Sequence, residues 1–227
     1  MSFNCWRGYQ AIYKVDNDSF FLVDILKFYE LSNGEIDKAA SVKRMTEIFG
    51  DEVVNNRVYI TWFTGDISFP LNNNVIRWDG VFYRIYEKET VIGIAAGKIT
   101  KIEDVSNYED DPKAIDRRDK AKVSDILFNQ ISKLKWKKID DFCAEYYTVT
   151  IGKDGAIARV SMSSYQSPDS IEFYWDKWEY DSCITTIRRS LNNLKFDILK
   201  DKGKPISENI YIGLWYDTKK RRIQKHF

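Results

Sequence analysis

Residue types that carry much of protein catalysis and metal binding are scarce in this 227-residue chain. Its single histidine, His226, excludes both a multi-histidine metal site and a histidine-based catalytic triad within one chain. Proline and glycine are also sparse, at four and eleven residues, and the composition is that of a globular protein. Aromatic residues, by contrast, make up 15% of the chain, and large flat side chains at this density favour β-sheets.

Cysteine occurs three times, at Cys5, Cys143 and Cys183, without a Cys-x-x-Cys pair. An odd count at wide spacing argues against a disulfide scaffold and against a zinc ribbon. We therefore expect reduced, buried thiols, as is typical of a cytosolic protein. The sequence shows neither a signal peptide after Met1 nor an apolar run of the ~20 residues that a membrane helix needs, so the predicted location is the cytoplasm.

The charges nearly cancel, with 35 basic residues against 34 acidic ones. No net field draws in nucleic acid or an anionic membrane, so neither is a predicted partner, and binding to either would need a local patch. The phosphate-binding motifs Gly-x-x-x-x-Gly-Lys-Ser/Thr and Gly-x-Gly-x-x-Gly are missing, as is the Gly-x-Ser-x-Gly nucleophile elbow. The sequence predicts no catalytic residue, metal ligand or cofactor. A hydrolase with paired carboxylates stays an alternative, because sequence does not show which acids face each other.

The first part of the chain, residues 1–103, predicts an antiparallel sheet domain with one short helix. Strand-forming residues over 9–15 and 20–28 flank the turn signal Asp16-Asn17-Asp18, which indicates a β-hairpin. Apolar residues recur at helical spacing over 38–49, and Gly50 ends that helix. Further strands are predicted at 57–63, 81–86 and 91–99.

Residues 104–138 predict a charged linker followed by a connecting helix. The linker contains Glu109-Asp110-Asp111-Pro112, which lacks the spaced ligands and glycine of a calcium-binding loop. From Lys113 onward, apolar residues at helical spacing predict a helix that ends near Leu134.

The last part, residues 139–227, predicts a strand, a tight hairpin, a helix and a final strand. Strands are expected at 146–151 and 156–162 around Lys153-Asp154-Gly155, because Asp and Gly tolerate the positive φ of a tight turn. A helix contains Cys183, and a last strand covers 208–215. The fold class predicted for the whole chain is α+β.

This C-terminal pattern resembles the C-terminal domain of TonB-type proteins. The Asp154-Gly155 hairpin and the turn Gly203-Lys204-Pro205, which follows Lys195-Phe196, carry most of the likeness. The resemblance implies a β-hairpin–α–β chain path over about 142–227, but it is poorly specific for function. A TonB-type membrane anchor and proline-rich spacer are missing, and Ile198 stands where the family has proline. Residues 1–103, with Trp6-Arg7-Gly8-Tyr9, are similar only to uncharacterised bacterial proteins.

An aromatic and acidic segment, 163–181, interrupts the TonB-like pattern between its hairpin and its helix. Aromatic side chains dominate interface energetics and acidic ones steer a basic partner, whereas the same aromatics in a structural role would pack inward. The predicted partner-binding residues are Tyr174, Trp175, Asp176, Trp178, Glu179 and Tyr180. The basic run 219–222 is interpreted as a solvated tail, and His226 as an exposed residue.

Together these features predict a non-enzymatic protein-binding module, of the inhibitor or immunity type, that recognises a basic protein partner. A hydrolase and an envelope-associated TonB-like scaffold are the alternatives. Sequence does not indicate the oligomeric state.

Overall fold

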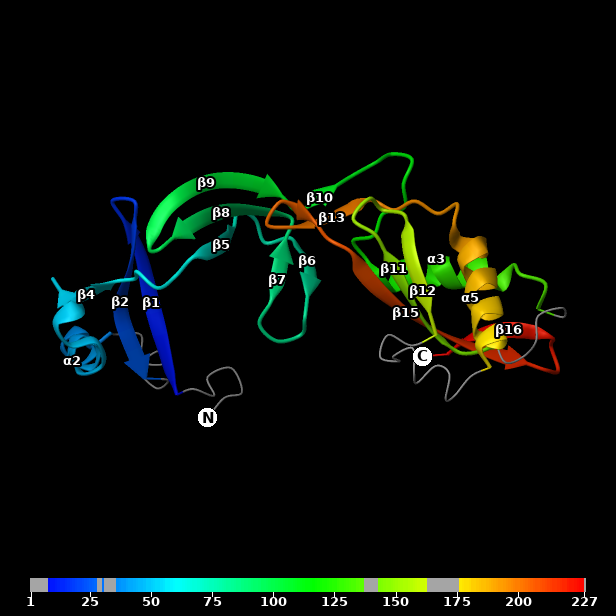
Figure 1. Ribbon diagram of the computed structural model, residues 1–227, viewed down its shortest axis with the longest axis horizontal. Helices are drawn as coiled ribbons and strands as arrows, with labels where there is room; N and C mark the ends of the chain where they lie inside the picture. The colour runs from blue at the N-terminus through cyan, green and yellow to red at the C-terminus, as the bar shows by residue number, and fades with distance from the viewer. Residues whose placement is uncertain (1–7, 28–29, 31–35, 137–142, 163–175, 227) are drawn as a thin grey trace. The chain divides into compact units, whose positions relative to one another are not determined.

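The computed structural model describes residues 8–27, 30, 36–136, 143–162 and 176–226 (Figure 1). Within them the fold is α+β, with three α-helices, several antiparallel sheets and 46% strand, which confirms the predicted fold class. The chain divides into two compact units, Met1–Val105 and Ser106–Phe227. None of the helices in the described residues has the length and apolar character needed to cross a bilayer.

The first unit is built on a seven-stranded antiparallel sheet. Its main path runs β3-β4-β2-β9-β8-β5, and β1 pairs with β2 beside that path. The strands are β1 (Tyr9–Asp16), β2 (Ser19–Lys27), β3 (Val53–Val54), β4 (Arg57–Tyr59), β5 (Gly65–Pro70), β8 (Lys88–Ala95) and β9 (Lys98–Ser106). Within the described part of the chain, β2 is the only strand that pairs with β1, so β1 lies at a sheet edge.

The β1–β2 hairpin confirms the turn predicted at Asp16-Asn17-Asp18. Asn17 and Asp18 both take positive φ, 45° and 56°, as a tight hairpin turn requires. The pairing register shifts after Ile12, where Val23 is the extra residue of a bulge. Tyr9, Ala11 and Tyr13 lie on one face of β1 because side chains alternate along a strand. They pair with Lys27, Ile25 and Leu22, and the bulge is the reason why Leu22 rather than Val23 lies opposite Tyr13.

Helix α2 (Lys38–Phe49) has the predicted bounds and ends at Gly50, whose φ is +55°. The Asp37 side chain caps its start by accepting a hydrogen bond from the Ala40 amide at 3.0 Å. Met45 is fully buried in the core of the unit, and the helix packs against β2, β3 and β4. The short 3-10 helix η2 (Gly50–Glu52) follows it.

Three predicted strands of the first unit differ from the structure. The strand predicted at 91–99 is divided between β8 and β9 by a turn at Ala96 and Gly97, which both have positive φ. The strand predicted at 57–63 ends at Tyr59, and the chain then turns at Thr61 and Trp62. The strand predicted at 81–86 is β7 (Arg84–Tyr86) alone. It pairs with β6 (Val75–Trp78) in a separate two-stranded sheet.

The second unit packs two helices on a four-stranded sheet of order β12-β11-β15-β16. Helix α3 contacts β15 and β16, and α5 contacts β12 and α3. These elements are α3 (Lys120–Ser132), β11 (Tyr146–Ile151), β12 (Ile157–Ser161), α5 (Lys177–Leu191), β15 (Glu208–Asp217) and β16 (Arg222–His226). Three residues of each helix are fully buried in one apolar core: Val123, Leu127, Ile131, Cys183, Ile187 and Leu191.

A three-stranded sheet of order β10-β13-β14 belongs to the same unit, with β10 (Tyr108–Glu109), β13 (Ile198–Asp201) and β14 (Lys204–Pro205). Residues 108–109 were predicted to belong to a charged linker. They instead form strand β10, which pairs with β13. The predicted connecting helix begins at Lys120 rather than near Lys113, since the Asp119 side chain caps it at that point.

Two predictions about the second unit were wrong. The cysteines are not all reduced, because Cys143 and Cys183 form a disulfide with Cα atoms 5.4 Å apart. The packing of α5 brings Cys183 to the chain just before β11, which their separation of 40 residues does not reveal. The basic run 219–222 is not a tail but the turn between β15 and β16, and Arg221 there has a φ of 50°.

Candidate functional site

The predicted partner-binding residues lie at the start of α5, as far as the structure describes them. Tyr174 and Trp175 are outside the described residues. Asp176 caps the helix, since its carboxylate accepts a hydrogen bond from the Trp178 amide at 2.8 Å. Tyr180 is half-buried and packs against the core of the unit. These two side chains therefore have structural roles.

Trp178 is the most exposed aromatic residue among those described at this helix start, with 70% of its surface accessible to solvent. Glu179 beside it is half-buried, and Asp181 forms an exposed ion pair with Lys177 at 2.6 Å. Lys177 therefore neutralises part of the negative charge at the start of α5, which weakens the attraction of this surface for a basic partner.

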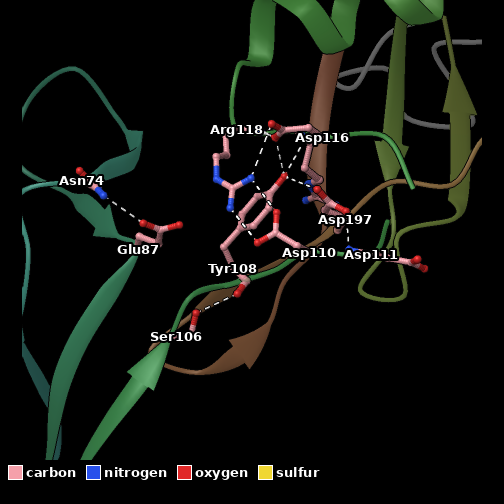
Figure 2. A network of polar contacts seen from close by, with 10 residues as sticks. Asn74, Glu87, Ser106, Tyr108, Asp110, Asp111, Asp116, Arg118 and Asp197 are labelled. Atoms are coloured by element: carbon pink, nitrogen blue, oxygen red, sulfur yellow. Dashed lines mark hydrogen bonds and ion pairs between the residues drawn. The ribbon is translucent and has the colours of Figure 1, made fainter. Parts of the chain in front are cut away.

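A polar network around Tyr108 brings the carboxylates of Asp116 and Asp197 to one hydroxyl group, and is therefore a candidate for the carboxylate pair of a hydrolase (Figure 2). The Tyr108 hydroxyl lies 2.8 Å from the Asp116 carboxylate and 2.9 Å from that of Asp197, and accepts a hydrogen bond from the Arg117 amide. Arg118 stacks over the Tyr108 ring at 3.9 Å and forms a bidentate ion pair with Asp110.

The directions in which the pKa values of this network are shifted favour a structural role over a catalytic one. The amide of Arg118 is the main cause that lowers the pKa of Asp116, and the Arg118 side chain lowers that of Asp110. Burial raises the pKa of Tyr108, so the phenol stays protonated. A general acid needs a raised carboxyl pKa, and both of these acids shift in the opposite direction. The network instead fixes the chain after β9 to β13, where Asp197 also accepts a hydrogen bond from the Asp111 amide at 2.9 Å.

Metal binding has no support in the described part of the chain. No group of three or more Asp, Glu, Cys or His side chains there is arranged to hold an ion.

The first unit contains a groove of about 550 Å³ over the β1–β2 hairpin. We call it the β1 groove. Its floor is one face of the hairpin, formed by Tyr9, Ala11 and Tyr13 of β1 with Leu22, Ile25 and Lys27 of β2. Its wall is the last two turns of α2, with Arg44, Glu47, Ile48 and Phe49, together with Trp62. Helix α2 packs over β2, so the face of β1 beside it forms the floor of an open groove.

The side chains around the β1 groove are large, apolar and exposed. Tyr9, Tyr13, Ile48 and Trp62 each expose between 49% and 62% of their surface. Trp62 stacks on Phe49 with ring centroids 5.6 Å apart, so the wall is a packed surface rather than a loose side chain. Exposed apolar patches of this kind mark interaction sites more often than ordinary surface.

An ion pair braces the wall of the groove against its floor. The Arg44 guanidinium donates hydrogen bonds to the Ile25 carbonyl at 2.7 Å and to both carboxylate oxygens of Glu30, the longer at 2.7 Å. The Lys27 amide also donates to Glu30 at 2.9 Å. These donors, Arg44 first, lower the pKa of Glu30 below its usual 4.5. The position of α2 over β2 is therefore fixed by charge as well as by Met45.

Sequence reasoning missed the β1 groove. The signal in the sequence is the alternation of Tyr9, Ala11 and Tyr13, which predicts a strand but not a groove. The floor depends on a bulge that sequence did not indicate, and the wall depends on which strand α2 covers.

Comparison with models of protein families, with curated proteins and with solved structures finds no match to this chain. The resemblance to TonB-type proteins therefore remains a prediction from the sequence pattern, and function must be argued from the surfaces themselves.

Proposed function

We propose that the protein is a non-enzymatic protein-binding module that accepts an extended segment of another polypeptide along β1. The observation that carries the proposal is the apolar β1 groove, whose floor strand is an edge strand of the described sheet. An incoming strand forms main-chain hydrogen bonds with such an edge, and adjacent pockets select its side chains.

The form of the groove favours a peptide over a small molecule. Pockets for small ligands bury most of the ligand surface, whereas the rim residues here are about half exposed themselves. A strand added to β1 uses a long, shallow surface, and its main chain supplies much of the affinity.

The groove also indicates the chemistry of the bound segment. In an added strand every second side chain lies on the groove side, next to Tyr9, Ala11 and Tyr13. These neighbours favour aromatic or β-branched residues at alternate positions. Lys27 is exposed at one end of the floor and favours an acidic residue at that end.

Peptide selection with matched variants tests this proposal. Peptides enriched from a random display library on the folded protein are synthesised, and their affinities are measured by calorimetry. We expect Ile48→Ser in the groove wall to weaken binding about tenfold, because it removes part of the apolar surface that the peptide covers.

The control is Val54→Ser, on β3 and outside the groove. Val54 is 60% exposed, close to the 62% of Ile48, and we expect its replacement to leave the affinity unchanged. Equal binding by wild type and Ile48→Ser would contradict the proposal, as would a library that yields no groove-dependent peptide.

The start of α5 is a second candidate surface, favoured by the exposure of Trp178. In this candidate the protein binds a basic partner, as an inhibitor or immunity-type protein would, at the residues predicted from sequence: Tyr174, Trp175, Asp176, Trp178, Glu179 and Tyr180. Trp178 is the anchor, while Asp176 and Tyr180 hold the helix that presents it.

The TonB-like chain path of the second unit is likewise a proposal, and the disulfide favours its envelope-associated version. Disulfides persist in oxidising compartments and are rare in the cytosol. Cys143–Cys183 therefore supports a protein that works outside the cytoplasm, against the location expected from sequence. Titrating free thiols in denatured protein taken from its native cells tests this. With the disulfide intact, Cys5 alone gives one free thiol. Three free thiols would show that the disulfide is absent and would favour the cytoplasmic location instead.

A further inference from the structure

The β6–β7 hairpin presents a cluster of exposed apolar side chains at its tip. Its two strands pair with each other and not with the seven-stranded sheet, and they extend away from β8 in the same unit (Figure 1). The residues at the tip are Trp78, Val81, Phe82 and Tyr83, and each exposes between 44% and 62% of its surface. We call these four residues the hairpin tip.

Hydrogen bonds within the loop hold the hairpin tip in its shape. The Asp79 carboxylate accepts hydrogen bonds from the amides of Val81 at 2.7 Å and Tyr83 at 3.0 Å. The Asp79 amide donates to the Tyr83 carbonyl at 3.1 Å, and Gly80 has a φ of 90°. The apolar side chains are therefore displayed by a formed turn, so their exposure is a property of the fold.

Two arginines stand directly behind the tip. Arg84 is the cross-strand partner of Trp78, and its guanidinium carbon lies 5.3 Å from the centroid of the Trp78 ring. Arg77 precedes Trp78 on β6. The acidic residue of the loop is Asp79, whose carboxylate already accepts hydrogen bonds from the backbone amides of the loop. Aromatic side chains lie at the end of the hairpin and arginines lie behind them. In a bilayer, the apolar region likewise lies below a layer of anionic headgroups, so both kinds of side chain would reach a matching layer.

We propose that the hairpin tip inserts into the headgroup region of an anionic lipid bilayer. The area favours a membrane over a protein partner. Three half-exposed aromatic residues offer roughly 300 Å², well below the ~800 Å² per partner of a stable protein interface. A fluid bilayer accepts a small convex tip without a complementary pocket. The charged Asp79 limits the depth to the interface, where Trp and Tyr are enriched.

This proposal is independent of the peptide proposal, because no residue of the hairpin tip lines the β1 groove. It differs from the expectation that the protein has no membrane partner, which rested on the net charge of the whole chain. The local patch that such binding requires is present at the hairpin.

Vesicle flotation with the full chain tests the proposal. The probes are vesicles of pure phosphatidylcholine and vesicles with 30% phosphatidylglycerol added, at about 0.1 M salt. We expect binding to the anionic vesicles, and we expect Phe82→Ser to weaken it about tenfold through lost apolar area. Arg84→Gln should weaken it about fivefold, since one cation near an anionic surface contributes about that factor.

The matched control is again Val54→Ser, an exposed apolar residue of the same unit outside the hairpin tip, which should float like the wild type. Circular dichroism verifies that each variant is folded. No flotation of the folded wild type with anionic vesicles would overturn the proposal, as would equal flotation of wild type and Phe82→Ser. Binding of a library peptide that depends on Phe82 while vesicles are ignored would assign the tip to a protein partner instead.

Discussion

Both units of this protein have a buried apolar core, but the first leaves many more large apolar side chains exposed than the second. The second unit has one core between two helices and a sheet, with a disulfide and a fully buried arginine. The first unit leaves apolar side chains exposed along the β1 groove and at the hairpin tip. This difference is the reason why we place both proposed interaction surfaces, the β1 groove and the hairpin tip, on the first unit.

The largest effect is expected from Arg117→Ala in the second unit. The Arg117 side chain is fully buried, donates to the Asp197 carbonyl at 3.3 Å and lies 3.5 Å from the Glu208 carboxylate. Its removal leaves a buried carboxylate without its cation, which costs about 3–5 kcal/mol in the free energy of unfolding. Hydrogen exchange resolved by residue should show the loss in the second unit only.

Lys195→Ala is the control for that variant, because Lys195 forms an exposed ion pair with Asp111 in the same unit. Its effect should be below about 1 kcal/mol. If the two variants destabilise the unit equally, the buried pair does not have the role assigned to it.

The next largest effect is expected from removal of the disulfide. Replacing Cys143 and Cys183 by alanine releases a loop closed over a separation of 40 residues. The loss of this constraint on the unfolded chain corresponds to about 4 kcal/mol in the loop-entropy model. Denaturation of the double variant, followed by hydrogen exchange, measures it. Unchanged protection in α5 would show that the disulfide does not stabilise the unit.

A smaller effect, one of pH, is expected in the first unit. Because the pKa of Glu30 is lowered in the folded state, its ionised form stabilises the fold above about pH 4.5. That contribution is lost as the pH falls through the lowered pKa. We expect wild type to lose protection in α2 on acidification more steeply than Glu30→Gln, which has no such group to titrate. Parallel pH profiles of the two proteins would rule out the Arg44–Glu30 brace.

The smallest effect on stability is expected from Trp178→Ala. Most of the Trp178 surface is in solvent, so its loss should change the free energy of unfolding by less than about 0.5 kcal/mol. Tyr180→Ala, which removes a side chain packed against the core, should cost more. Thermal unfolding of both variants measures the difference, and a larger loss for Trp178→Ala would make Trp178 a structural residue instead of an exposed anchor.

Local signals account for the parts of the fold that sequence predicted well. The bounds of α2 follow from apolar periodicity and Gly50, and those of β11 from alternation and the turn at Asp154-Gly155. The β1–β2 hairpin follows from a turn whose residues tolerate positive φ. In each case the information lies within a few residues of the element.

The features that sequence missed depend on contacts between distant segments. The disulfide forms because α5 packs across the chain before β11, and the network around Tyr108 joins residues about 90 positions apart. The β1 groove needs both the bulge opposite Ile12 and the placement of α2 over β2. Neither the spacing of residues along the chain nor the composition predicts these contacts.

The central claim is that the first unit binds an extended peptide along β1. A titration of ¹⁵N-labelled protein with a selected peptide tests it most directly. The account predicts amide shift changes in β1 and the end of α2, together with slower hydrogen exchange along β1 as new main-chain hydrogen bonds form. Shift changes confined to the second unit, with β1 exchange unaltered, would contradict it.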